Sequence, residues 1–538
     1  MKLTKKEIYF LIIAILILLV VTNLPILYGY LIRSNDYYNG LHIFSPLDGS
    51  VYYSYIQQVK DGKILLDDLF TNESGGLRLF NIFWLIVGLA ARIFHLSAPW
   101  AYHIFRIILM PIFLLVLYKF VRYLLADYSA FQKKIAFLYA IFATGIGGLT
   151  LLLFGNRFFN NNPLDLQVPE SSNFLITLYS PHFIASITLI VLIFYFFLLA
   201  IDNNKIHHSL AAGFFALVLF NFHPFYVPVV YVIPAVYLAV LFLINKKVEV
   251  KKIGHYLILV VMSAPSVIYY AYLLYTSPAL QIKAAQNNCL TPGGMIFFVS
   301  YGLGLIMAIG ACVYLVDRRK IDHKKLFLII WFWLGIFFIY SPFNFQRRLT
   351  EGFVIPLSLL AFMALAIVYD FLKEGWPFVK KIKFWQALPL LVLLFCFSNP
   401  LVYSWDFKYL KLKPPVIFIN QDIKQALEWY RTQTNLEQTL LTSRIIGNIV
   451  PGLVGRRVFL GHDVETVNYD NKINQLNWFF GTNNDDLLKK EFLKQNNINY
   501  LFYSSQERQM GLFQPDKKDY LREGYNQNGI KIYKVKAD

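Results

Sequence analysis

Long apolar stretches, separated by short polar segments, fill the first three quarters of this 538-residue chain. A helix needs about 20 consecutive apolar residues to cross a bilayer, where it satisfies its own backbone polar groups. Eleven stretches are candidates, of which one is short. They are 8–32, 99–118, 135–155, 181–201, 208–221 (the short one), 224–244, 253–276, 292–316, 325–341, 352–372 and 384–403. The sequence therefore predicts a polytopic α-helical membrane protein of about eleven spans.

Composition excludes other classes of protein. With 57% hydrophobic and 15% charged residues, the chain is too apolar for a soluble globular protein. The formal net charge of +18 does not indicate nucleic-acid binding, because the basic residues fall in short runs between apolar stretches. Cys289, Cys312 and Cys396 lie in or beside apolar stretches without metal-ligand spacing, so neither a disulfide framework nor a zinc site is expected. The stretch 8–32 is too long for a cleaved signal sequence and is interpreted as a retained first span.

The orientation of the chain depends on one further apolar segment, residues 80–96. If this segment is a juxtamembrane helix on the exterior face, the inside loops carry 21 basic residues and the outside loops nine. The nine are Arg33, Lys60, Lys63, Arg78, Arg92, Arg157, Lys283, Arg347 and Arg348. The positive-inside rule favours this assignment. We therefore expect a multi-pass protein of the cell (plasma or inner) membrane, with a cytoplasmic N-terminus and an exterior C-terminal domain.

The chain changes character after residue 405. Residues 406–538 are charged and mixed, and helical stretches alternate there with strand-like runs. The predicted helices are 421–430 and 485–495, and the predicted strands are 439–443, 457–462, 500–504 and 531–535. The expected organisation is a transmembrane module at 1–405, with a first exterior loop at 33–98, and a small exterior α/β domain at 406–538.

Asp48 is the first candidate functional residue. It lies in the first exterior loop, at the start of an amphipathic stretch that Gly62 ends. Apolar and aromatic residues follow at helical spacing, at Tyr52, Tyr55, Ile56 and Val59. Asp48 is either a helix N-cap or a general base, and the two roles are compatible. The positive end of a helix favours an ionised carboxylate, which is the state that a base needs.

Other polar residues lie in the second exterior loop and at two helix ends. The loop at 156–180 contains Arg157, Asp165 and Glu170, for which a solvated loop is the alternative to a binding role. His182 begins the span at 181–201, facing the exterior. His223 interrupts an apolar stretch, where polar groups usually face protein or water rather than lipid. A histidine satisfied by its own helix break is as good an interpretation of His223 as a ligand-binding one.

Arg347 and Arg348 lie between two spans on the exterior side, where basic residues are sparse. Planar guanidinium groups can bind a lipid phosphate at the bilayer surface through paired hydrogen bonds. The alternatives are a salt bridge to Glu351 and extension of the side chains toward the lipid interface.

Together these features resemble the GT-C superfamily of integral-membrane glycosyltransferases, which includes oligosaccharyltransferases, protein O-mannosyltransferases and aminoarabinose transferases. The resemblance covers essentially the whole chain. It includes Asp48 after one span, the amphipathic pair 51–60 and 80–96, the late arginines and the exterior C-terminal domain. The run 450–466 also resembles uncharacterised prokaryotic members. Paired acids in the first loop and the WWDYG motif are missing, so neither N-glycosylation nor an obligatory metal is implied.

The resemblance implies transfer of a sugar from a polyprenyl-phosphate carrier to a lipid, glycan or protein acceptor outside the membrane. Asp48 would be the catalytic base, with inversion at the anomeric carbon, and the other site residues would bind substrate. These are Arg347, Arg348, His182, His223, Tyr53, Arg157 and Glu170. The expected partners are the donor, the acceptor and membrane lipids, without nucleic acid. No cofactor is expected with certainty, and no ligand motif supports a divalent metal.

Two other functions fit the same architecture. A transporter or flippase would have many spans and broken helices, but it would more naturally show internal repeats and charges inside the membrane. A non-catalytic membrane scaffold would keep the architecture without needing Asp48. Substitution of Asp48 separates the scaffold from the enzyme. Consumption of a polyprenyl-phosphate sugar without vesicles separates the transporter from the enzyme.

Overall fold

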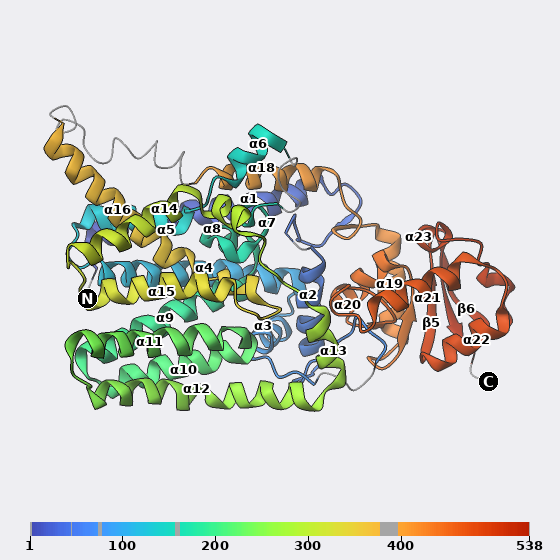
Figure 1. Cartoon of the computed structure of the whole chain (residues 1–538). Coiled ribbons are helices and arrows are strands. Elements are labelled where there is room, and N and C mark those ends of the chain that lie inside the picture. The colour runs from blue at the N-terminus through green and yellow to red at the C-terminus, as the bar shows by residue number, and fades with distance from the viewer. Residues whose placement is uncertain (1–2, 45, 74–77, 156–161, 377–395, 537–538) are drawn as a thin grey trace. The chain divides into compact units, whose positions relative to one another are not determined.

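The computed structural model of the protein describes residues 3–44, 46–73, 78–155, 162–376 and 396–536 (Figure 1). The chain divides into two compact units. Unit 1 comprises Met1–Asn23, Phe105–Tyr270 and Asn288–Trp405, and unit 2 comprises Leu24–Ile104, Ala271–Asn287 and Asp406–Asp538. The expected domain boundary between residues 405 and 406 stays a prediction. Trp405 is the last residue of unit 1, and Asp406 begins the last segment of unit 2.

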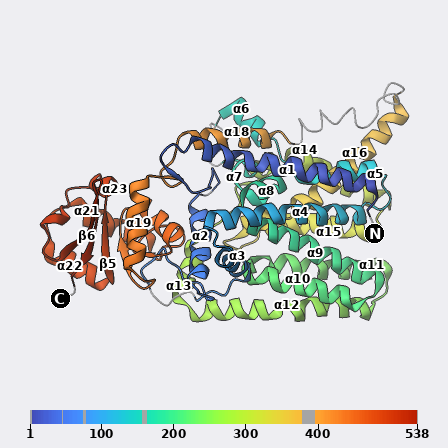
Figure 2. The same ribbon diagram turned by 180° about the vertical axis from the view of Figure 1, so that it is seen from behind.

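The described residues before 406 are mostly helical, as their apolar composition predicts. Figure 2 shows the long helices from behind. The helices of 12 or more residues are α1 (Lys5–Ile32), α2 (Pro46–Lys60), α3 (Ile82–Ile93), α4 (Ala98–Leu124), α5 (Ala130–Phe142), α9 (Pro181–Asn203), α10 (Ile206–Phe222), α11 (Val227–Asn245), α12 (Val250–Thr276), α14 (Gly294–Asp317), α15 (His323–Ile339), α16 (Val354–Gly375) and α18 (Ser398–Lys411). Shorter helices and turns are α6 (Gly147–Phe154), α7 (Leu164–Gln167), η2 (Pro169–Ser171), α8 (Asn173–Tyr179), η3 (Pro224–Tyr226), α13 (Pro278–Gln286) and η4 (Gln346–Thr350).

Seven of the described helices are long and apolar enough to cross a membrane. They are α1, α4, α9, α11 with its preceding turn, α12, α14 and α16. The bent pair α5 and α6, which changes direction by 51°, makes an eighth span if it is counted as one. Two more predicted spans are helices of 17 residues, α10 and α15. Most of the predicted span at 384–403 lies outside the described residues.

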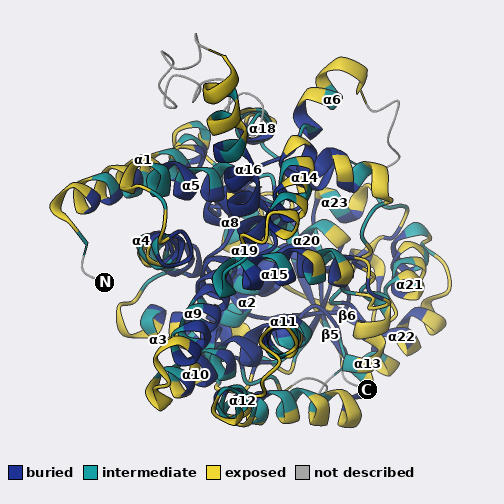
Figure 3. Ribbon diagram, turned by 60° about the vertical axis from the view of Figure 1, so that its left-hand side comes forward, coloured by how far each residue is buried: buried dark blue, intermediate teal, exposed yellow. Residues whose placement is uncertain are grey.

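The helices differ strongly in burial. Figure 3 shows α9 largely buried and α12 largely exposed. The exposed side chains of α12 include apolar ones such as Val261 and Ile268. An apolar helix surface that is not covered by protein suits contact with lipid tails. The burial pattern therefore agrees with a multi-pass membrane protein.

Asp165 explains the bend between α5 and α6. Its carboxylate is fully buried and accepts hydrogen bonds from the backbone N–H groups of Gly145 (3.1 Å) and Gly147 (3.3 Å), which lie at the break. The hydroxyl of Ser398 donates a third hydrogen bond, 2.6 Å long. These backbone donors have lost their intrahelical partners, so a buried acceptor is needed there. The interpretation of Asp165 as part of a solvated loop is wrong.

The two helices expected at 51–60 and 80–96 are present as α2 and α3, both in unit 2, and their juxtamembrane position stays a prediction. Asn81 caps α3 by accepting a hydrogen bond from the Trp84 backbone. The stack of Tyr52 on Trp84, with ring centroids 5.0 Å apart, joins α2 to α3. Gly62 has a φ of +97°, which ends α2 two residues after Lys60. The amphipathic pattern fits α3, which buries one face, whereas α2 is buried on most of its surface.

The C-terminal part of unit 2 is an α/β domain, as predicted. Its strands are β3 (Thr439–Leu441), β4 (Arg457–Val458), β5 (Ile498–Tyr503), β6 (Leu521–Gln527) and β7 (Ile530–Val535), which form a mixed sheet in the order β4-β3-β5-β7-β6. Its helices are α19 (Gln421–Gln433), α20 (Arg444–Val454), α21 (Tyr469–Gly481), α22 (Asp486–Gln495) and α23 (Ser505–Arg508). The predictions missed β6, and also the short antiparallel pair β1 (Tyr37–Tyr38) and β2 (Phe418–Ile419).

Alternate residues of the central strands face two separate cores. Leu440 and Phe502 pack with residues of α19 and α20, whereas Leu441 and Leu501 pack with residues of α21 and α22. Successive side chains of a strand point to opposite faces, so helices cover both faces of this sheet. The sheet and the two helical layers support the loop that follows β4. This loop carries residues of the candidate site.

Candidate functional site

Asp48 lies in the first turn of α2, two residues after the helix begins. It is therefore not the N-cap residue, although the helix dipole still favours its ionised form. Its side chain is 42% exposed, and Nε2 of His462 lies 3.0 Å from its Oδ1. His462 itself is buried. An ionised, accessible carboxylate held by a buried histidine can accept a proton from a bound group.

The backbone around His462 determines which ring nitrogen carries the proton. The N–H of Val464 donates to Nδ1 of His462 over 3.1 Å, so the neutral ring carries its proton on Nε2 and donates it to Asp48. Burial alone lowers the pKa of His462, but the hydrogen bond and negative charge of Asp48 outweigh it and raise that pKa above its usual value. The charges of Glu465 and Asp463 act in the same direction.

A buried ionic cluster lies next to this pair in unit 2. Lys283, on α13, is 2.8 Å from Oδ2 of Asp68 and also pairs with Glu465. Burial lowers the pKa of Lys283, but the two carboxylates raise it above its usual value, so the side chain stays charged. The hydroxyl of Thr466 donates to the Phe70 carbonyl over 2.8 Å and accepts from the backbone of Gly461. These contacts fix the loop that carries His462.

A second group of predicted site residues comes together in unit 1. The rings of His182 and His223 lie at nearly right angles, with centroids 5.1 Å apart. The hydroxyl of Ser180 is 2.5 Å from Nδ1 of His182. His223 packs on Phe225 at 4.9 Å, and the guanidinium of Arg348 lies over Phe225 at 5.4 Å. The start of α9, the break before α11 and η4 therefore meet at one place.

Glu351, which follows η4, is buried beside this group. Its carboxyl accepts hydrogen bonds from the hydroxyls of Ser186 and Tyr226. Burial raises the pKa of Glu351 to about 8, and the nearby charge of Glu170 adds to that effect. Two neutral hydroxyls thus hold this carboxyl, and a salt bridge from Arg347 or Arg348 is not needed to explain its burial.

The other predicted site residues have the following positions. Arg347 donates its backbone N–H to the Cys289 carbonyl over 2.9 Å. Tyr53 lies on α2, where its buried hydroxyl donates to the Asn39 carbonyl over 3.0 Å. Glu170 lies in η2 and is partly buried. Arg157 lies outside the described residues.

Sequence reasoning missed His462, Lys283, Asp68 and Glu465 as parts of the site. His462 and Glu465 lie in the run 450–466, which carried a resemblance but no assigned role. No spacing rule connects these residues to Asp48, because His462 is 414 positions away. In the part of the chain that the structure describes, no three His, Cys, Asp or Glu side chains are placed to hold a metal ion.

No family model matches the chain, and no curated protein matches its sequence. Solved structures do match its fold. The apo oligosaccharyltransferase of Archaeoglobus fulgidus is 13% identical with a TM-score of 0.57, over 92% of this chain and 70% of that one. The archaeal oligosaccharyltransferase AglB from the same organism, in complex with an inhibitory peptide and a dolichol-phosphate, is 11% identical with a TM-score of 0.54, over 93% and 70%.

ArnT from Cupriavidus metallidurans, bound to undecaprenyl phosphate, is similar over almost the full length of both chains. It is 11% identical with a TM-score of 0.51, and the match covers 99% of this chain and 98% of ArnT. At such low identity the likeness concerns the fold and not the chemistry. The predicted GT-C-like architecture, a polytopic helical module with a C-terminal α/β domain, is thus the fold of this chain.

Proposed function

We propose that this protein is a membrane glycosyltransferase that moves a sugar from a polyprenyl-phosphate carrier to an acceptor on the exterior side of the membrane. The observation that carries the proposal is the pairing of Asp48 with His462 at an accessible position on α2. The shared fold supports it, because the similar ArnT structure is bound to undecaprenyl phosphate and the similar AglB structure contains a dolichol-phosphate.

In the proposed reaction, Asp48 acts as the general base. A hydroxyl or amine of the acceptor attacks the anomeric carbon and gives its proton to Asp48. The new bond joins the acceptor to that carbon, and the bond from the carbon to the carrier phosphate breaks with inversion. The hydrogen bond that Nε2 of His462 donates to Asp48 orients the carboxylate.

The departing carrier phosphate needs positive charge nearby. Arg348 is the better placed of the two arginines, because its guanidinium is held over Phe225 beside the histidine pair. Fixed cationic donors stabilise a developing anion without having to reorient during the reaction. We assign phosphate binding to Arg348, with His182 and His223 as neighbouring polar groups and with Arg347 as the second arginine.

Substitution of Asp48 by Asn tests the proposal. Asn keeps the size of the side chain and can still accept a hydrogen bond from His462, but it cannot take up the acceptor proton. We expect the release of polyprenyl phosphate from a polyprenyl-phosphate sugar pool to fall by about 10²- to 10⁴-fold. Mass spectrometry of the lipid product measures this release from purified, reconstituted protein.

Asp519→Asn is the matched control, because Asp519 is an exposed acid on the surface of the α/β domain. It should release polyprenyl phosphate at the rate of the parent. Thermal unfolding of both variants in the same detergent checks that each is folded. If folded Asp48→Asn protein keeps the parent rate within a few-fold, Asp48 is not the base.

A further inference from the structure

A cavity of about 540 Å³ lies in unit 2, on the face of α2 away from Asp48. From α2 it is lined by Ser50, Tyr53, Gln57 and Lys60. These four positions follow helical spacing and lie on one side of α2, whereas Asp48 projects from the other side toward His462. Its volume is typical of small-molecule sites, which run from roughly 300 to 1,000 Å³. The cavity is therefore distinct from the candidate catalytic position.

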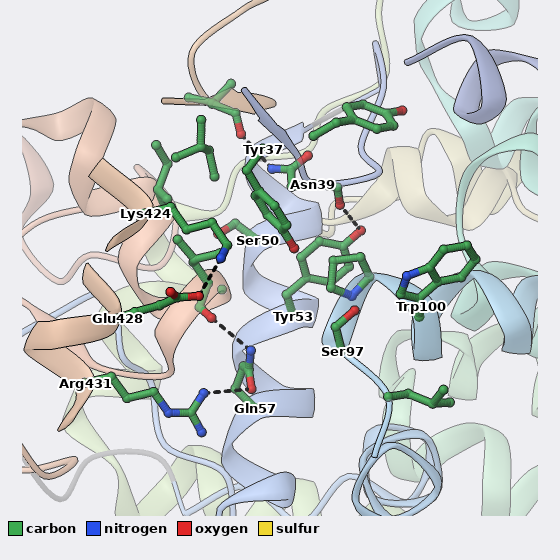
Figure 4. A pocket seen from close by; sticks show the side chains of 18 of the residues that line it. Tyr37, Asn39, Ser50, Tyr53, Gln57, Ser97, Trp100, Lys424, Glu428 and Arg431 are labelled. Carbon is green, nitrogen blue, oxygen red and sulfur yellow. Dashed lines mark hydrogen bonds and ion pairs between the residues drawn. The ribbon is translucent and has the colours of Figure 1, made fainter. Parts of the chain in front are cut away.

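Aromatic side chains form much of the remaining wall. Tyr30 and Trp100 stack with ring centroids 5.9 Å apart and an interplanar angle of 15°. Tyr37 and Tyr38 of β1 also line the cavity. Figure 4 shows Trp100 on the opposite side of the cavity from α19, with α2 between them. Flat aromatic faces beside polar groups suit a ring that has one apolar face and several hydroxyls.

The polar lining carries more positive than negative charge. The only acid of the lining, Glu428, pairs with Lys424 over 2.6 Å on α19. Arg431, also on α19, pairs with an acid outside the lining. Arg33 and Lys60 have no carboxylate partner in the part of the chain that the structure describes. Neither cation therefore forms an ion pair there, although the negative charge of Asp61 acts on Lys60.

The environment of Lys60 makes its charge costly. Burial lowers the pKa of Lys60 and the neighbouring charge of Arg431 lowers it further, while the charge of Asp61 offsets only part of the decrease. A bound anion would relieve both effects by giving the ammonium a partner. An aromatic belt at the membrane interface would account for Tyr30 and Trp100. It would not account for the Gln57 amide and the Lys60 ammonium on the α2 side of the cavity.

We infer that this cavity binds a saccharide that carries an acidic group, a carboxylate or a phosphate. The sugar ring lies against Tyr30, Trp100 and Tyr53, and the acidic group lies at one of the two cations without an ion pair, Arg33 beside Tyr30 or Lys60 at the end of α2. The inference goes beyond the proposed function, because binding here requires no sugar transfer and does not involve Asp48. The saccharide is either free or the headgroup of a glycolipid, since both offer the same chemistry.

Calorimetric titration of the purified full chain with two disaccharides tests this site. One disaccharide ends in glucuronic acid, and the other is identical except that it ends in glucose. We expect the acidic one to bind at least about tenfold more tightly, because a charge-assisted hydrogen bond contributes about 1.5–3 kcal/mol and 1.4 kcal/mol is a factor of ten. Whichever of Arg33→Gln and Lys60→Gln removes the contacting cation should lose about tenfold of that affinity, while Trp100→Ala weakens the binding of both disaccharides.

Two control variants separate binding in this cavity from general charge attraction and from sugar transfer. Arg522→Gln removes an exposed arginine on β6, outside the cavity, and should bind the acidic disaccharide like the parent. Asp48→Asn should also bind it like the parent, whatever its transfer rate. These controls can therefore contradict the proposed function while supporting this binding site, or contradict the binding site while supporting the proposed function.

Vesicles identify the source of the ligand. Protein that binds vesicles containing glucuronosyl diacylglycerol more tightly than vesicles containing glucosyl diacylglycerol, in a manner that needs Arg33 or Lys60, but that does not bind the free disaccharide, takes a glycolipid headgroup. Binding of the free disaccharide alone assigns a soluble glycan. The inference is overturned if neither probe binds, if acidic and neutral disaccharides bind equally, or if folded Arg33→Gln and Lys60→Gln proteins bind like the parent.

Discussion

In the Asp48–His462 pair, an accessible carboxylate accepts a hydrogen bond from a buried imidazole ring. The other nitrogen of that ring accepts a hydrogen bond from the backbone. Because the Val464 N–H donates to Nδ1, the ring has one orientation in which Nε2 faces Asp48. Removal of the ring would take away the Nε2 donor that Asp48 has in the folded protein. His462 is thus a positioning residue for Asp48, and a conservative substitution separates its hydrogen bond from its charge.

Stability should depend on pH through His462. Its pKa is raised in the folded protein, so its contribution is fully present below its ordinary value of about 6.5 and is lost as pH rises through the raised value. We expect the melting temperature of the parent to exceed that of His462→Gln at pH 6, with a smaller difference at pH 9. Thermal melts across this range measure the difference. A difference that stays constant with pH would mean that the ring contributes only packing.

Stability should also depend on pH through Glu351, which is an acid whereas His462 is a base. Its folded pKa of about 8 lies above the ordinary value of 4.5, so the parent loses stability as pH rises between those values. Glu351→Gln resembles the protonated side chain and cannot ionise. We expect the melting temperature of Glu351→Gln to rise relative to the parent as pH rises from about 4.5 to about 8. Glu351→Ala is the contrasting variant, because it removes two hydrogen bonds and leaves the hydroxyls of Ser186 and Tyr226 only the carbonyls of Phe183 and Arg348, each 3.1 Å away. At about 0.5–1.5 kcal/mol for each lost hydrogen bond, it should destabilise by about 1–3 kcal/mol.

At the scale of elements, the bend between α5 and α6 depends on a close approach of backbone and carboxylate. A Cβ at Gly147 would lie 2.2 Å from Oδ1 of Asp165. The carboxylate is also fixed by Gly145 and Ser398. A side chain at Gly147 would therefore displace the acceptor that satisfies the broken helix.

Alanine substitutions at two glycines test this element. Gly147→Ala should lower the melting temperature, because Asp165 must move and its buried donors lose their partner. Gly310→Ala, in α14, should leave it unchanged or raise it, since no atom lies within 4 Å of that Cβ and alanine favours a helix over glycine by about 1 kcal/mol. Equal melting temperatures for the two variants would show that the break does not depend on Asp165.

At the scale of the whole molecule, we predict a cytoplasmic N-terminus and an exterior α/β domain, from the distribution of basic residues among the loops. Single cysteines near Lys251 and near Gln506 should then react with a membrane-impermeant reagent from opposite sides, with the position near Gln506 outside. Labelling of intact and opened cells measures the two sides. Labelling near Lys251 from outside would reverse the assignment of residues 80–96.

Much of the architecture could be predicted from local patterns. Apolar length gives the long helices, helical periodicity gives α2 and α3, and alternation gives β3, β5 and β7. The bent pair α5 and α6 was predicted as one continuous span, because the acceptor that allows the break, Asp165, comes from a later segment. Strand β6 was missed because most of its side chains are exposed and polar.

Local patterns alone establish that the chain crosses a membrane repeatedly, that it ends in an α/β domain and that Asp48 begins an amphipathic helix. These properties follow from hydrophobicity and periodicity within about 20 residues of chain. The folded structure was needed to show that His462 pairs with Asp48, that Lys283 bridges Asp68 and Glu465, and that two hydroxyls hold the buried Glu351. Such pairings join distant segments, and their energies depend on burial and geometry that no local pattern contains.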